Sequence, residues 1–248
     1  MHAQSADWLA AALITLASLG SAAHAQILQP TFSLEPNAED LPTFPPPQSS
    51  HFGSAVAIHG NTAMASIPGL SPQRVAVFTR DAAGTWQRTG TLLDEAGVAI
   101  AIDGDLALMS GQNQLSAYQR KGGAWTRVQT IATAGTVEDI ELDGSAAAHI
   151  EGSQIQFLHF NRNERRWHKG QPLQPSKPFG NRLALANDTL VLNASGMAYV
   201  FQRVGPAWRE RQVLLPGDGE PTFGSEVANS GDRIVVAARF ADFSNVYG

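Results

Sequence analysis

Residues 179–215 read FGNRLALANDTLVLNASGMAYVFQRVGPAWRERQVLL. It contains four short apolar runs, and the breaks between them carry Asn, Asp, Gly, Ser and Pro. Runs of four to eight residues bounded by such turn formers are typical of β-strands. The stretch therefore predicts four consecutive strands, over Leu183–Leu185, Thr189–Leu192, Ala198–Phe201 and Trp208–Leu215.

The same four-strand pattern recurs along most of the chain. Its tryptophans are separated by 39, 42 and 41 residues and lie at Trp86, Trp125, Trp167 and Trp208. Each unit opens on a dipeptide that ends in glycine: Phe52-Gly53, Ala96-Gly97, Ala134-Gly135, Phe179-Gly180 and Phe223-Gly224. A second pair suits a tight two-residue hairpin with positive φ: Gly60-Asn61, Gly104-Asp105, Gly144-Ser145, Asn187-Asp188 and Gly231-Asp232. A period near forty with four strands per unit is the signature of a repeat architecture.

We interpret the repeat as an all-β fold, a β-propeller built from four-stranded blades whose first strands lie nearest the axis. Five units can be counted over residues 51–248, but the fifth ends at 245–248, in its third strand. Residues 26–35 contain ILQPTFSL, which resembles WQRTGTLL at 86–93. This N-terminal strand is expected to close the last blade, because unpaired strand edges favour aggregation. The alternative is that the chain is a truncated part of a larger propeller.

The order of these landmarks resembles the FG-GAP repeat, which forms the propeller of integrin α-subunits and occurs in exported bacterial proteins. The resemblance covers about residues 52–248 and is best in the units that open at Phe52, Phe179 and Phe223. It is weakest in the unit at Ala134, which lacks the phenylalanine. Family members often bind calcium in a D-x-D-x-D-G type loop. This chain has no such loop, so no calcium or other cofactor is expected.

The N-terminal residues predict export. Residues 1–25 combine an apolar core with Ala23-His24-Ala25, which is the A-x-A pattern of a cleaved signal peptide. Their apolar run is shorter than the roughly 20 residues that span a bilayer, so no membrane span is expected in the mature chain. Residues 36–50 contain five prolines and read as an extended linker. The expected location is periplasmic or extracellular.

Composition limits the possible partners. The chain has 248 residues, a formal charge of −5 and no cysteine. Nucleic acid and anionic membranes both require a basic surface, so neither is an expected partner. Without cysteine there is neither a disulfide framework nor a thiolate nucleophile.

The sequence contains no G-x-S-x-G, H-E-x-x-H or G-x-x-x-x-G-K motif. One acidic cluster comprises Glu138, Asp139, Glu141 and Asp143. Because strand neighbours point to opposite faces, Asp139, Glu141 and Asp143 can share one face near the axis, where they could bind a cation, while Glu138 cannot. The alternative is that Asp143 is a turn residue and Glu141 faces a wet channel.

Other chemically active residues favour structural roles. His149, His159 and His168 fit no short metal-ligand spacing, so His159 and His168 are expected at the surface or a sheet edge. The basic run Arg162, Arg165, Arg166, His168 and Lys169 reads as a solvated hairpin, or alternatively as a docking site for an acidic partner. The four repeat tryptophans could stack on sugars, but their phase with the blades favours packing between blades.

These observations predict an exported, non-enzymatic propeller that recognises a protein or glycan ligand or serves in adhesion. Function on such a scaffold resides in its loops rather than in its fold. A carbohydrate-binding, lectin-like propeller is the first alternative. The second is an enzyme with a ligand in the central channel, using Asp139, Glu141 or His149.

Overall fold

The computed structural model describes residues 51–93, 97–217 and 222–239. All of them belong to the second of two compact units into which the chain divides, residues 34–248. The predicted signal peptide (1–25), N-terminal strand (26–35), linker (36–50) and last strand (245–248) lie outside the described residues. Closure of the last blade therefore stays a prediction.

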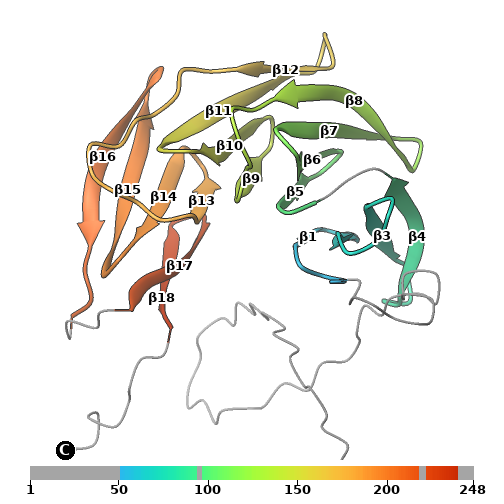
Figure 1. The fold of residues 1–248 in the computed structure, drawn as a ribbon, viewed down its shortest axis with the longest axis horizontal. Coiled ribbons are helices and arrows are strands. Elements are labelled where there is room, and N and C mark those ends of the chain that lie inside the picture. The colour runs from blue at the N-terminus through green and yellow to red at the C-terminus, as the bar shows by residue number, and fades with distance from the viewer. Residues whose placement is uncertain (1–50, 94–96, 218–221, 240–248) are drawn as a thin grey trace, which may run out of the picture. The chain divides into compact units, whose positions relative to one another are not determined.

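Every regular element in the described ranges is a β-strand, and the strands form five antiparallel sheets in chain order (Figure 1). Sheet 1 comprises β1 (Val56–His59), β2 (Thr62–Ile67), β3 (Arg74–Arg80) and β4 (Trp86–Leu93). Sheet 2 comprises β5 (Ile100–Asp103), β6 (Leu106–Gly111), β7 (Gln114–Lys121) and β8 (Ala124–Ala132). Sheet 3 comprises β9 (Ile140–Asp143), β10 (Ala146–Glu151), β11 (Gln154–Asn161) and β12 (Arg166–Lys169).

Sheet 4 confirms the four strands predicted from residues 179–215. It comprises β13 (Leu183–Ala186), β14 (Thr189–Ala194), β15 (Met197–Val204) and β16 (Ala207–Leu214). Sheet 5 is described for two strands, β17 (Phe223–Ser230) and β18 (Arg233–Ala238). In the described ranges, no helix is long and apolar enough to cross a bilayer.

The first two strands of each sheet are joined by the predicted two-residue turns. The first turn residue has positive φ in all five: Gly60 (57°), Gly104 (57°), Gly144 (61°), Asn187 (48°) and Gly231 (62°). Glycine and asparagine adopt this left-handed conformation at low cost. These turns fix the register of every first hairpin and so allow the five repeats to be aligned residue by residue.

That alignment corrects the predicted opening of the third repeat. β1, β5 and β13 each begin three residues after the glycine of the opening dipeptide, at Gly53, Gly97 and Gly180. β9 begins at Ile140, so the equivalent residue is Val137 and not Gly135. Val137 is fully buried. Ala134-Gly135 resembles the opening dipeptides in sequence, but its glycine lies two residues before Val137, the residue that the structure aligns with the opening glycines.

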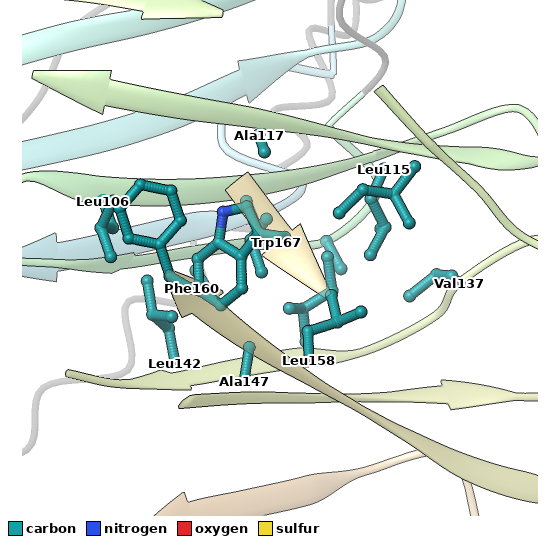
Figure 2. Close-up of a cluster of buried hydrophobic side chains, with 14 residues drawn as sticks. Leu106, Leu115, Ala117, Val137, Leu142, Ala147, Leu158, Phe160 and Trp167 are labelled. Atoms are coloured by element: carbon teal, nitrogen blue, oxygen red, sulfur yellow. The ribbon is translucent and has the colours of Figure 1, made fainter. Parts of the chain in front are cut away.

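Consecutive sheets pack through their first strands, because β1 contacts β5, β5 contacts β9, β9 contacts β13 and β13 contacts β17. Apolar side chains fill the space between neighbouring sheets. Between sheets 2 and 3, Leu106 and Leu115 meet Leu158, Phe160 and Trp167 (Figure 2). Four-stranded antiparallel sheets packed in this way form a β-propeller, as the repeat predicts.

Candidate functional site

A pocket of about 180 Å³ lies where the first strands of four sheets converge. Sheets 1 and 2 contribute an apolar wall that includes Val56 and Val98, which are 65% and 49% exposed. Sheets 3 and 4 contribute the charged side chains Glu138, Asp139 and Arg182. A concave site with one apolar wall and a few convergent polar groups is the usual form of a small-molecule site. We call it the axial pocket.

The repeat alignment explains why this pocket is charged on one side. Asp139 and Arg182 occupy the position that holds Ala55 in sheet 1 and Ala99 in sheet 2, and Glu226 occupies it in sheet 5. The four equivalent residues of sheets 1 to 4 all line the pocket. The position therefore faces the pocket in the first four repeats, and the pocket is charged because the third and fourth repeats have Asp139 and Arg182 in place of alanine.

Asp139 is held in place by main-chain groups of two sheets. Its Oδ2 accepts a hydrogen bond of 2.8 Å from the N–H of Leu183 at the start of β13, and its Oδ1 accepts one of 3.1 Å from the N–H of Ile140. Burial raises the pKa of Asp139 to about 6, against the opposing effect of the Leu183 hydrogen bond and of Arg182. At neutral pH the carboxylate is ionised and close to its pKa, as a general base requires.

Glu141 lies two residues further along β9, on the same face as Asp139. It stands where the other repeats have Ala57, Ala101, Ala184 and Ala228. Its cross-strand partner is Ala148, whereas the partners of those alanines are the larger Met64, Leu108, Val191 and Val235. The small Ala148 makes room for the longer side chain, so the third repeat is built around a glutamate.

The Glu141 carboxyl is half-buried and makes no hydrogen bond to another described residue. Burial raises its pKa to about 8, and the nearby Asp139 carboxylate adds to this shift. At neutral pH Glu141 is therefore protonated while Asp139 is ionised. Two carboxyls whose environments separate their pKa values can act as an acid and a base.

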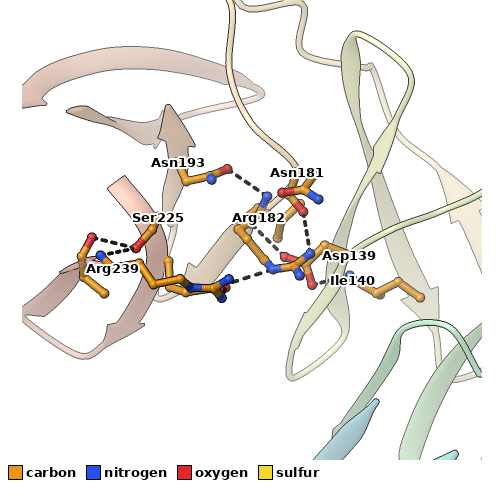
Figure 3. Close-up of polar contacts among 10 residues, drawn as sticks. Asp139, Ile140, Asn181, Arg182, Asn193, Ser225 and Arg239 are labelled. Carbon is orange, nitrogen blue, oxygen red and sulfur yellow. Dashed lines mark hydrogen bonds and ion pairs between the residues drawn. The ribbon is translucent and has the colours of Figure 1, made fainter. Parts of the chain in front are cut away.

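Arg182 connects sheet 4 to sheet 5 (Figure 3). Its Nε donates to Glu226 Oε2 at 3.1 Å, and its Nη1 donates to the carbonyl of Asn181 at 3.1 Å. Arg239 Nη2 reaches the other oxygen of Glu226 at 2.7 Å. Glu226 is thus shared by two guanidinium groups, and it fixes the direction of the Arg182 side chain at the pocket.

The predicted acidic cluster is confirmed in its geometry. Asp139, Glu141 and Asp143 share the face of β9 that is turned toward sheet 4, because Asp139 and Asp143 both accept main-chain hydrogen bonds from that sheet. Glu138 is exposed. Among the described residues, no group of three or more His, Asp or Glu side chains is placed to hold a metal ion.

The three histidines do not meet. His149 is completely buried in β10, with its Nε2 3.4 Å from Glu151 Oε2, and burial lowers its pKa to about 4. His159 and His168 are exposed and lie opposite each other on β11 and β12, as the predicted edge position requires. The basic run is likewise an exposed hairpin, from which Arg162 reaches Asp105 of sheet 2 at 3.1 Å.

The repeat tryptophans serve packing, as their spacing favours. Trp167 is buried against Phe160, and Trp208 stacks flat on Phe157 with ring centroids 4.8 Å apart. Trp86 and Trp125 each lie under an arginine of the neighbouring strand. Trp167 is therefore inaccessible, and a protein group covers one ring face of each of the other three tryptophans.

Sequence reasoning missed Arg182 and the apolar wall of the axial pocket. The signal was present in the sequence. The correct alignment places Ala, Ala, Asp, Arg and Glu at the position of Asp139 in repeats one to five. At the position of Glu141, every repeat except the third has alanine. When the third repeat is opened at Ala134-Gly135, its residues align two positions out of register with the other repeats. Asp139 and Glu141 then no longer fall at the positions of their structural equivalents.

The chain matches no family model and no curated protein. It is similar to several solved structures. A functionally unknown protein from Desulfotomaculum acetoxidans is 16% identical, with a TM-score of 0.53 over 64% of this chain and 56% of that one. A protein from Lactobacillus plantarum is 12% identical, with a TM-score of 0.56 over 75% and 70%.

Two further structures are Bacteroides proteins, each named a "putative 6-phosphogluconolactonase". The B. uniformis protein is 12% identical, with a TM-score of 0.53 over 68% of this chain and 59% of that one. The B. fragilis protein is 13% identical, with a TM-score of 0.52 over 66% and 56%. The matches span 56 to 59% of the Desulfotomaculum and Bacteroides chains. At these identities they show the fold, a multi-blade β-propeller.

The prediction that the protein is not an enzyme is wrong. It rested on missing catalytic motifs and on the resemblance to a recognition scaffold, yet two structures with this fold carry an enzyme's name. Short motifs identify sites in which the catalytic residues are close in sequence. A propeller instead assembles its axial site from residues about forty positions apart, which no short motif detects.

Proposed function

We propose that the protein is an enzyme that hydrolyses a small cyclic ester where the axial pocket borders β9. Asp139, which lines the pocket, is the general base, and Glu141, two residues further along and outside the pocket lining, is the general acid. The observation that carries the proposal is Glu141 itself. It replaces an alanine found in all four other repeats, lies half-buried beside Asp139, and has no hydrogen-bond partner among the described residues. A buried ionisable group with no structural partner costs stability, so a functional role explains its presence.

The chemistry follows from the two protonation states. Asp139 accepts a proton from a water molecule, and that water attacks the carbonyl carbon of the ester. As the ring C–O bond breaks, Glu141 gives its proton to the departing oxygen. Residues i and i+2 of a strand are roughly 7 Å apart, which leaves room for a water and a carbonyl group between the two carboxyls. The free Nη2 of Arg182 is available to the carbonyl oxygen, where negative charge develops.

The substrate class is suggested by the fold comparison. A lactonase opens a cyclic ester, and this is the reaction that the names of the two Bacteroides proteins imply for those proteins. The axial pocket fits a ligand of this size and polarity, because it is small and has one apolar and one charged wall.

The test is hydrolysis at pH 7 by the full chain, followed as proton release with δ-gluconolactone, its 6-phosphate and dihydrocoumarin as probes. We expect Asp139→Asn and Glu141→Gln each to lower kcat by about a hundredfold or more, as loss of a general acid or base does. Asp143→Asn is the matched control, since Asp143 lies on the same face of β9 but its carboxylate already accepts the N–H of Asn187. It should keep the wild-type rate.

A wild-type rate equal to the uncatalysed rate with all three probes would refute the proposed hydrolysis of small cyclic esters. Equal rates in wild type, Asp139→Asn and Glu141→Gln would refute the roles of the two carboxyls. Melting temperatures of the variants separate loss of catalysis from loss of fold.

We propose recognition of a protein or glycan partner as the second candidate function. Val56 and Ile58 on β1 are 65% and 64% exposed, and Val98 is 49% exposed. Large apolar side chains exposed together on neighbouring strands favour a binding surface. Ile58→Ser, at a residue outside the lining of the axial pocket, would weaken such binding in a pull-down without changing hydrolysis, whereas unchanged binding would refute this surface.

We further propose that the repeats are related to FG-GAP repeats and that the protein is exported. The Phe-Gly pairs at 52–53, 179–180 and 223–224 support the first proposal, and the apolar core and Ala23-His24-Ala25 support the second. Fractionation of cells that express the full chain, with N-terminal sequencing, tests export. A mature chain that begins at Gln26 is expected, and an intact cytoplasmic chain would refute it.

A further inference from the structure

A second cavity lies between sheets 3 and 4, away from the axial pocket, and encloses about 150 Å³. One wall is apolar and contains the stacked rings of Phe157 from β11 and Trp208 from β16, which are nearly parallel at 6°. Both rings are only partly buried. The cavity therefore presents an aromatic surface to whatever enters it, at the junction of two sheets.

Polar side chains surround the aromatic pair. Asp143, Asp188 and Arg203 line the cavity together with Gln171. One oxygen of Asp143 accepts the N–H of Asn187, which leaves the other free of a described partner. Arg203 Nη1 lies 3.6 Å from Asp188 Oδ1, which is too long for a good hydrogen bond. The site thus offers both acceptors and donors that its own residues leave unsaturated.

The equivalent groove between sheets 1 and 2 gives a comparison within the same molecule. There Arg120 pairs with Trp125 across β7 and β8, as Arg203 pairs with Trp208 across β15 and β16. Arg120, however, donates to Thr62 Oγ1 at 2.7 Å and lies over the Trp125 ring. Both Nη groups of Arg120 therefore have partners, because its Nη2 also reaches the carbonyl of Gly104. Arg203 donates only its Nε, to the carbonyl of Gly205 at 3.2 Å, so the unsaturated Nη groups belong to the groove between sheets 3 and 4.

We propose that the groove between sheets 3 and 4 binds a neutral pyranose sugar, with its apolar ring face on Trp208 and its hydroxyls on Asp143, Asp188 and Arg203. Sugars combine an apolar C–H face with hydroxyls that both donate and accept, which matches an aromatic wall with carboxylates and a guanidinium. Two carboxylates against one guanidinium disfavour a phosphorylated or acidic sugar. The volume is below the roughly 300 Å³ of a larger ligand site, which fits a single ring. This proposal does not depend on hydrolysis at the axial pocket.

The test is titration of the full chain with the methyl glycosides of glucose, galactose, mannose and N-acetylglucosamine, and with glucose 6-phosphate. Binding is read from saturation-transfer NMR and from tryptophan fluorescence. Arg203→Ala removes the donor, and Asp188→Asn removes one charge while keeping a residue that tolerates the positive φ of 59° at this position. Arg209→Ala is the matched control, because it removes the same charge from the residue next to Trp208 on the opposite face of β16.

We expect at least one neutral glycoside to bind with millimolar affinity, more tightly than glucose 6-phosphate. Its affinity should fall about tenfold in Arg203→Ala, with an unchanged melting temperature, and stay at the wild-type value in Arg209→Ala. Absence of binding by all four glycosides at 50 mM would overturn the proposal. So would equal affinity in wild type and Arg203→Ala, or tighter binding of the phosphorylated sugar.

Discussion

The Asp143 carboxylate accepts a hydrogen bond of 2.7 Å from the main-chain N–H of Asn187, which belongs to the next sheet. Asp103, the equivalent residue of sheet 2, accepts in the same way from Gly144 of sheet 3, and it also contacts His59 of sheet 1 at 2.9 Å. Between sheets 4 and 5, Asn229 Nδ2 donates to the carbonyl of Thr189 at 3.0 Å. A polar link therefore joins each sheet to the next beside the first turn.

The first prediction concerns this link. Asp143→Ala removes the acceptor of the Asn187 N–H and should lower the free energy of unfolding by about 1 kcal/mol, measured by urea denaturation. Asp143→Asn keeps an acceptor oxygen and should lose less than half of that. Equal losses in the two variants would mean that charge, and not the hydrogen bond, matters here.

The second prediction separates two glycines that look alike in sequence. A Cβ on Gly180 would clash with Asn193 Oδ1, the atom that accepts the hydrogen bond from the Arg182 N–H. Gly180→Ala should therefore cost about 1–3 kcal/mol, as overpacking does. A Cβ on Gly135 meets no atom within 4 Å, so Gly135→Ala should be tolerated. Equal destabilisation of both in thermal melts would restore Ala134-Gly135 as the opening of the third repeat.

The third prediction follows from the raised pKa of Glu141. The folded protein holds this proton up to about pH 8, while an unfolded glutamate releases it near 4.5. The native state therefore binds more protons than the unfolded state between these values, and stability must fall as pH rises through the folded pKa. Between pH 6.5 and 8.5 the melting temperature should decrease in wild type. In Glu141→Gln the melting temperature should decrease less over this range. An equal decrease in the variant and in wild type would show that Glu141 is not the group whose titration lowers the stability.

The fourth prediction concerns acid stability. Buried His149 stays neutral to about pH 4, whereas an unfolded histidine gains a proton near 6.5. The unfolded state binds more protons in this window, so His149 makes the fold lose stability as pH falls from 6.5 to 4. His149→Met introduces the residue found at the equivalent position of sheet 2, Met109. The variant should lose less stability than wild type as pH falls from 6.5 to 4. An equal loss of stability in both proteins would show that His149 is not its cause.

The strands and turns could be predicted from sequence because each is specified locally. A two-residue turn such as Asn187-Asp188 fixes the register of its hairpin, and alternation in the flanking residues then assigns each side chain to a face. The shared face of Asp139, Glu141 and Asp143 was predicted correctly for this reason.

The axial pocket could not be predicted in the same way. It depends on which residues of different repeats come together, and an error of two residues in the frame of the third repeat separates Asp139 from Arg182 in an alignment. Burial of Glu141 and His149 is equally non-local, because both depend on neighbouring sheets. The shifted pKa values that suggest catalysis arise from that burial.

The pH dependence of lactone hydrolysis by the wild-type full chain tests the roles of Asp139 and Glu141 directly. Catalysis needs an ionised Asp139 and a protonated Glu141, whose pKa values are about 6 and about 8. We predict a bell-shaped profile of kcat/KM with its maximum near pH 7, falling below about pH 6 and above about pH 8. In Glu141→Gln the residual rate should no longer fall on the alkaline side. A profile that keeps rising with pH, as uncatalysed hydroxide attack does, would contradict the assignment of Asp139 and Glu141 as base and acid.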